Sequence, residues 1–200
     1  MFCQCIKRRL PDQRLDVKNR ERIGESELKS RIALLLSSGT IKKDRWQVEA
    51  LVPARALCPL DVKFYCFYGR VALVMEVQRY PELQYNWYGA NGDRVTTGLD
   101  EGLEFEGDGI TPQEIEAVAK ITLEIPAPFI RVDFLRSEDG HLIFGEFTPR
   151  PGEFHKFNSM TDSSLGREYN AAVARLNDDI LTGKSFTTFS AMTAKTGSGF

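Results

Sequence analysis

The chain has 200 residues, of which 42% are hydrophobic and 27% charged, and its formal net charge is -2 at pH 7. These values are typical of one globular domain with its own core, and so small a net charge gives no electrostatic basis for binding nucleic acid or an anionic membrane. The N-terminus MFCQCIKRRL lacks the apolar centre of a signal peptide, and no segment resembles a membrane span of about 18 apolar residues. We therefore expect a cytoplasmic protein with no nucleic-acid partner and no membrane span.

Residues 1–45 are expected to form an N-terminal arm followed by a helix. The first 19 residues are charged and follow no sustained period, which predicts a mobile or extended arm. Apolar residues then recur at helical spacing before an SSG stop: Ile23, Leu28, Ile32, Leu35 and Leu36. The next segment, RWQVEALV, is short and partly β-branched and ends at Pro53, so it predicts a strand over 45–52.

The middle of the chain predicts a hairpin, a long loop and a helix. Residues 61–80 hold two aromatic and β-branched runs around a YGR turn, as in a β-hairpin. Residues 81–109 are rich in turn signals and predict a long loop, which in a compact domain is usually functional or disordered. The helix expected at 111–125 has Thr111 as its cap and Glu114 in the position that completes a capping box.

The last third predicts a second hairpin, a helix over 163–184 with a glycine stop, and a frayed tail over 185–200. Strands and helices that mix without strict alternation indicate an α+β (mixed α/β) domain, in which helices back an antiparallel sheet. We assign that domain to residues 46–184.

The second hairpin, PFIRVDFLRSEDGHLIFGEFTPRPG over residues 128–152, carries an unusual polar face. Side chains alternate between the two faces of a strand, and any even-length loop keeps Arg131, Asp133, Glu146 and Thr148 on one face. With SEDG as the loop, the expected cross-strand pairs are Arg136 with His141, Asp133 with Phe144, and Arg131 with Glu146. The opposite face is expected in the core: Ile130, Val132, Phe134, Ile143 and Phe147.

Two carboxylates at cross-strand or diagonal reach repel each other unless a cation lies between them. Magnesium suits this position because it accepts one or two carboxylates together with phosphate oxygens and water. Arg131 beside them is suited to gripping phosphate. The pattern alone also fits a solvated outer face on which Arg131 simply pairs with Glu146.

The motifs together are more specific. RVDF, a ten-residue gap and FGEFTPRPG resemble the metal-binding signature of ATP-grasp ligases, and FYCFYGRV, IRVDF, FGEFT and FHKFNSMTDSSLG resemble the teichuronopeptide-biosynthesis (TupA-like) branch. The resemblance covers roughly residues 46–184. It implies the C-terminal subdomain of an ATP-grasp fold, with ATP and Mg²⁺ as cofactors and amide formation between a carboxylate and an amine. The reaction it implies belongs to cell-surface polysaccharide or peptide-polymer biosynthesis.

The resemblance also implies roles for individual residues. Asp133 and Glu146 would hold magnesium, and Thr148 falls where many relatives have an asparagine as a further metal ligand. Arg131 would contact the terminal phosphate or an oxyanion, and Lys63 in DVKF would contact phosphate or substrate. The segment Glu49, Ala50 and Leu51 would form the hinge strand whose backbone binds adenine.

Residues next to PRPG are candidates for the substrate side. Arg150 lies between two prolines that restrict the backbone on both sides, so its guanidinium can be held in a fixed direction. His155 and Lys156 follow closely, and both are also ordinary surface residue types.

No glycine-rich phosphate loop and no strand ending in lysine precedes Trp46, so the resemblance covers only the C-terminal half of the fold. Three accounts follow: a fragment whose other half lies upstream or on another chain, a short form that binds magnesium–nucleotide weakly, or a non-catalytic module for a glycan or protein partner. An aromatic loop supports the last account through stacking on sugars. Its members are Tyr80, Tyr85, Trp87 and Tyr88.

Overall fold

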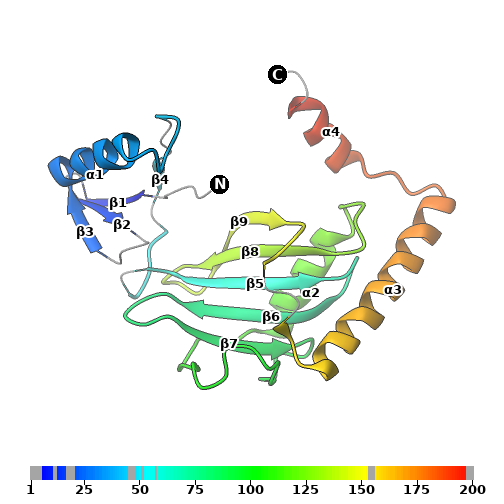
Figure 1. The fold of residues 1–200 in the computed structure, drawn as a ribbon. Coiled ribbons are helices and arrows are strands. Elements are labelled where there is room, and N and C mark those ends of the chain that lie inside the picture. Colours follow the sequence, from blue (N-terminus) through cyan, green and yellow to red (C-terminus); the bar gives the residue numbers. More distant parts are fainter. Residues whose placement is uncertain are drawn as a thin grey trace.

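The computed structural model describes residues 6–10, 13–16, 21–44, 48–50, 52–56, 58–152 and 156–196. Its described strands form two sheets (Figure 1). The five-stranded sheet has the order β7-β6-β5-β8-β9, and every neighbouring pair in it is antiparallel. Its strands are β5 (Leu60–Cys66), β6 (Val71–Gln78), β7 (Gln84–Gly89), β8 (Ile130–Arg136) and β9 (Leu142–Thr148). The expected α+β class with an antiparallel sheet backed by helices is confirmed.

Each face of this sheet buries a separate apolar cluster. One face packs against α2 (Pro112–Thr122), and its fully buried members include Val62, Phe64 and Val132. The other face packs at one end against α3 (Ser159–Leu181), through the buried Ala172 and Leu176. Helix α3 therefore covers only part of this second face.

The capping box predicted for α2 is confirmed. The Thr111 hydroxyl accepts the Glu114 backbone N–H at 3.2 Å, and the Glu114 carboxylate accepts the Thr111 backbone N–H at 2.8 Å. Helix α3, which was expected over residues 163–184, begins four residues earlier, because Asn158 caps it by accepting the Thr161 N–H at 2.8 Å. Its glycine stop is present, with Gly183 at φ +90°.

The smaller sheet has the order β3-β2-β1-β4 and lies beside α1. Its elements are β1 (Ile6–Leu10), β2 (Gln13–Asp16), β3 (Glu21–Gly24), β4 (Val48–Ala50) and α1 (Glu25–Ser37). Strands β1 and β2 therefore occupy the segment in which we expected an arm. Strand β4 occupies the centre of the strand expected at 45–52, and it pairs in parallel with β1.

Two further elements differ from the sequence expectations. Strand β7 lies inside the segment predicted to be a long loop, where it pairs antiparallel with β6. Helix α4 (Thr187–Thr196) lies in the segment predicted to be a frayed tail. In the described part of the chain, no helix has both the length and the apolar character needed to cross a bilayer.

Candidate functional site

The candidate site lies on the open face of the five-stranded sheet, beside the part covered by α3. It begins with Lys63 on β5, which is the direct register partner of Asp133 on the neighbouring strand β8. Arg131 lies two residues before Asp133, so alternation places it on the same face. Lys63 and the RVDF motif are 70 residues apart in sequence and are brought together by strand pairing.

Asp133 is held by two cations. Arg131 donates from Nε and from an Nη, each at 2.7 Å, to the two carboxylate oxygens, and Lys63 Nζ donates at 3.0 Å. The exposed fractions of these side chains are only 8% for Asp133, 13% for Arg131 and 15% for Lys63. Burial opposes the charge of Arg131, but its hydrogen bond to Asp133 and the charge of that carboxylate raise the pKa of the guanidinium. The two-point contact makes this a strong ion pair.

Glu146 and Thr148 join the same face from β9, but the predicted register is wrong. Arg136 pairs with Leu142 rather than His141, and a bulge between Asp133 and Phe134 then sets Asp133 opposite Glu146. The two one-residue shifts run in the same direction and add to a shift of two residues. Because side chains alternate with a period of two, the polar residues stay on one face. Glycine at 145 allows this bulge, since a Cβ there would lie 3.0 Å from the Asp133 carbonyl oxygen.

Strand β9 also corrects the predicted core. Ile143 and Phe147 are 42% and 40% exposed, and Phe144 is 51% exposed. The reason is that β9 is an edge strand, with β8 as its sole neighbour among the described strands. Ile130, Val132 and Phe134 on β8 are buried as expected.

A second ion pair extends the polar strip along β5. Arg79 donates to Asp61 at 2.7 Å, and Asp61 lies 3.9 Å from Lys63. Three cations, Lys63, Arg79 and Arg131, thus face two carboxylates, Asp61 and Asp133, which leaves one net positive charge on the strip. Asp61 and Arg79 were not among the residues predicted for the site. Asp61 belongs to the DVKF motif and Arg79 directly follows its hairpin partner β6, and these positions could have indicated the pair.

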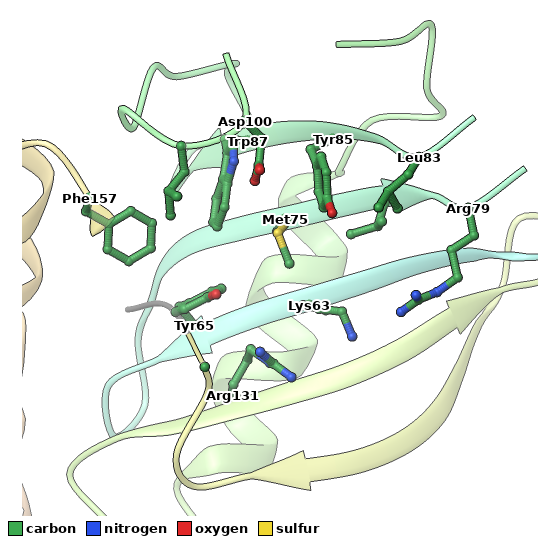
Figure 2. Close-up of a pocket in the computed structure, with 13 residues that line it drawn as sticks. Lys63, Tyr65, Met75, Arg79, Leu83, Tyr85, Trp87, Asp100, Arg131 and Phe157 are labelled. Atoms are coloured by element: carbon green, nitrogen blue, oxygen red, sulfur yellow. The ribbon is translucent and has the colours of Figure 1, made fainter. Parts of the chain in front are cut away.

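A cavity of about 270 Å³ lies over this strip (Figure 2). Lys63, Tyr65 and Arg131 line it from the strands, Asp100 lines it from the loop after β7, and Phe157 lines it from the segment before α3. Burial, opposed in part by the positive charge of Arg131, raises the pKa of the Tyr65 hydroxyl. The cavity therefore combines fixed cations with aromatic walls, as small-molecule sites commonly do.

Two of the four aromatic residues proposed to stack on sugars, Trp87 and Tyr88, are buried. Trp87 is 6% exposed and packs against Tyr65 and Phe157, with ring centroids 5.8 Å and 5.4 Å away. Tyr88 is 3% exposed, because both residues belong to β7 rather than to a loop. This removes the main support for the glycan-binding alternative.

The predicted adenine-binding segment is described in part. Glu49 and Ala50 belong to β4, whereas Leu51 lies outside the described residues. Of the candidates beside the PRPG motif, Arg150 and Lys156 are exposed, and His155 lies outside the described residues.

The oxygen ligands on the open face are compatible with magnesium. Glu146 is exposed, and no hydrogen bond or ion pair holds its carboxylate within the described chain. The described residues gather no cluster of three or more acidic, histidine or cysteine ligands. Magnesium bound here would therefore take one or two carboxylates and complete its shell with ligand and water oxygens, which is its usual behaviour at nucleotide sites.

A comparison with protein families places the protein among the ATP-grasp proteins. The family model described as "TupA-like ATPgrasp" matches residues 15–170, and the chain belongs to that TupA-like family. The match begins upstream of Trp46 and so includes β3 and α1 of the smaller sheet. The search of curated proteins finds no match.

Two solved structures of the ATP-grasp ligase PsnB are similar to this chain. One is a complex with a minimal precursor, with 9% identity, a TM-score of 0.39, and coverage of 62% of this chain and 36% of that chain. The other contains a phosphomimetic variant of the minimal precursor, Mg and ADP, with 11% identity, a TM-score of 0.33, and coverage of 59% and 33%. The chain thus matches about a third of the length of each PsnB chain.

Proposed function

We propose that the open face of the five-stranded sheet is the phosphate- and magnesium-binding wall of the ATP site of a carboxylate–amine ligase. The observation that carries this proposal is the partly buried group of Lys63, Arg131 and Asp133, which faces the exposed Glu146 across β8 and β9. An ordinary solvated strand face does not hold an arginine and a lysine on one carboxylate at these low exposed fractions.

Arg131 has a double role in this proposal. Without nucleotide it neutralises Asp133, so that the buried carboxylate is never left unpaired. When a nucleotide binds, the guanidinium exchanges the carboxylate for phosphate oxygens, which match its forked geometry equally well. Asp133 then becomes available as a metal ligand beside Glu146, and Thr148 lies within reach of both Arg131 and Asp133, at 3.4 Å and 3.5 Å.

The chemistry needs no protein nucleophile. A substrate carboxylate attacks the terminal phosphorus of ATP and releases ADP, and an amine then displaces phosphate from the acyl phosphate to form an amide. Magnesium, when bound, neutralises charge on the phosphate oxygens. Lys63 and Arg131 hold the phosphate in line and stabilise the developing negative charge, and the cavity walls restrict water.

Other parts of the proposal rest on the family. The backbone of Glu49, Ala50 and Leu51 would bind adenine. The reaction would serve cell-surface polysaccharide or peptide-polymer biosynthesis in the cytoplasm, with a second chain as a candidate supplier of further parts of the ATP site. A non-catalytic module would differ in showing no magnesium-dependent nucleotide binding.

Calorimetric titration with ATP, with and without MgCl₂, tests the site. We expect binding that requires magnesium and that Glu146→Gln weakens about tenfold, since one charged ligand is lost. Asp139→Asn is the matched control, because Asp139 is an exposed carboxylate in the turn of the same hairpin.

Glu146 is exposed, so its substitution should leave the fold intact, whereas Asp133→Asn also leaves two cations unpaired in a partly buried position. Circular dichroism of each variant separates loss of fold from loss of binding. Equal magnesium–ATP binding by wild type and Glu146→Gln would refute the assignment of this metal ligand, and absence of nucleotide binding by wild type would refute the proposal for this chain.

A further inference from the structure

A second cavity, of about 400 Å³, lies between the sheet, α3 and the Pro149–Pro151 turn. Its floor is formed by Phe67, which directly follows β5, and Phe129, which directly precedes β8. Tyr65 and Phe157 line both this cavity and the one over Lys63 and Arg131. The two cavities therefore adjoin, and one of them is apolar where the other is charged.

Helix α3 presents a regular stripe to this cavity. Asp162, Leu165, Gly166 and Tyr169 line it, and their spacing of three and four residues is that of one helix face. The floor beneath them is aromatic, so the cavity suits a compact apolar group rather than an extended polar chain.

The rim of the cavity carries one charge of each sign. Arg150 is exposed, and so is Asp162 in the first turn of α3. Within the described residues, neither side chain has a hydrogen bond or an ion pair. Both side chains line the cavity, so a ligand that carries the two opposite charges would meet one of each sign at the rim.

A glycine of α3, Gly166, also lines this cavity. It lies inside a 23-residue helix, where glycine reduces helix stability relative to alanine. No neighbour requires it: a Cβ at this position would meet no atom within 4 Å. Gly166 lines the cavity, so a side chain larger than a methyl group at this position would extend into the cavity mouth.

We propose that this cavity binds an apolar α-amino acid. Its aliphatic or aromatic side group would lie on Phe67 and Phe129, its carboxylate would pair with Arg150, and its amino group would donate to Asp162. As the amine substrate of the ligase, it would lie next to the Lys63 and Arg131 strip. This last role rests on the proposed function, whereas the binding itself does not.

The test is a titration of the full chain with L-phenylalanine, without ATP or magnesium, followed by calorimetry or ligand-observed NMR. Each comparison ligand lacks one of the three features: glycine lacks the side group, 3-phenylpropionate the ammonium, and phenethylamine the carboxylate. We expect each to bind about tenfold more weakly, because each leaves one contact unmade.

A pair of variants at one position tests the location. Gly166→Leu fills the cavity mouth and should weaken phenylalanine binding at least about tenfold, while Gly166→Ala should leave the affinity within about twofold. Both substitutions favour the helix, so a misfolded α3 is not the expected cause of lost binding. Arg150→Gln should remove the preference for L-phenylalanine over phenethylamine.

Several outcomes would overturn the proposal. The first is equal binding of glycine and phenylalanine, and the second is an unchanged affinity of Gly166→Leu for phenylalanine. The third is that phenylalanine does not bind and that the chain forms a dimer which Gly166→Leu dissociates. The last result would show that a second copy of the chain fills the cavity. Phenylalanine binding without any magnesium–ATP binding would support the cavity assignment and refute the ligase function, so the two failures are distinguishable.

Discussion

Glu76 lies fully buried in β6, and its replacement by glutamine is the sharpest test of how the site is supported. One carboxylate oxygen accepts the Asn86 amide at 3.1 Å and the Tyr88 hydroxyl at 2.9 Å, and the other accepts the Asp108 N–H at 3.1 Å. Gly107 passes so close that a Cβ there would lie 2.0 Å from the carboxylate. Glu76 therefore fixes the segment after β7 to the sheet.

The magnitude follows from these three donors. In Glu76→Gln, one acceptor oxygen becomes an NH₂ group, which loses at least one charge-assisted bond and weakens the others to neutral strength. Such a bond contributes about 1.5–3 kcal/mol and a neutral one about 1 kcal/mol, while a buried amide costs less than a buried carboxylate. We expect a net loss of about 2–3 kcal/mol in the free energy of unfolding.

Urea unfolding measures this loss, and hydrogen exchange shows where the structure loosens. We expect faster exchange over residues 100–110, and weaker ligand binding in the cavity that Leu99 and Asp100 line. The control is Glu106→Gln, an exposed carboxylate in the same segment. A loss below about 0.5 kcal/mol, or exchange equal to the control, would refute the anchoring role.

Tyr88 supplies a further readout of the same group. Burial, with the Glu76 charge beside it, raises the pKa of the Tyr88 hydroxyl to about 12. A raised tyrosine pKa contributes stability that is present below the ordinary value of about 10 and is lost as pH rises through the folded value. Glu76→Gln should therefore reduce the loss of stability between pH 10 and pH 12.

Three other predictions concern the hairpin and the cap of α2. Gly145→Ala places a Cβ 3.0 Å from the Asp133 carbonyl oxygen and should cost about 1–2 kcal/mol in urea unfolding, whereas equal stability would show that the bulge does not need glycine. Burial tends to raise the pKa of Glu114. The hydrogen bonds from Arg136 and from the helix cap outweigh burial, so the pKa of Glu114 is lowered. A lowered carboxyl pKa contributes stability at pH values above the ordinary pKa, and this stability is lost on acidification. Glu114→Gln should therefore lower the free energy of unfolding by about 1 kcal/mol at pH 7 and make it depend less on pH between pH 5 and pH 3. Equal pH dependence of unfolding in wild type and variant over that range would contradict this. Thr148→Asn should strengthen magnesium-dependent ATP binding a few-fold in calorimetry, because an amide oxygen is a better and longer ligand than a hydroxyl, and weaker binding would indicate that the hydroxyl's position near Asp133 matters more.

The sequence predicted the features that depend on near neighbours. The Thr111 and Glu114 capping box, the two hairpins and the shared face of Arg131 and Asp133 all follow from spacings of two to four residues. Lys63, another member of the polar strip, was assigned by family resemblance, and the structure adds that it pairs directly with Asp133.

Other features depend on the tertiary arrangement. Strand β7 lies between turn-rich stretches and is stabilised by pairing with β6, so its local pattern reads as loop. The bulge on β9 comes from the backbone space at Gly145, which no periodicity reveals. The ion pair of Asp61 with Arg79 and the burial of Trp87 need the whole sheet to form.

The pairing of β5 with β8 has a consequence for how the protein folds. Strands β5, β6 and β7 are neighbours in both sequence and sheet, and so are β8 and β9, whereas Cys66 and Ile130, the closest residues joined between the two groups, are far apart in the chain. Long-range pairing carries the larger loop-closure entropy and tends to slow folding. Lys63 and Asp133 lie on opposite sides of this seam, so we expect the polar strip to assemble in the same step that unites the two halves of the sheet. The residues proposed to bind phosphate would then form their contacts in the step that limits folding.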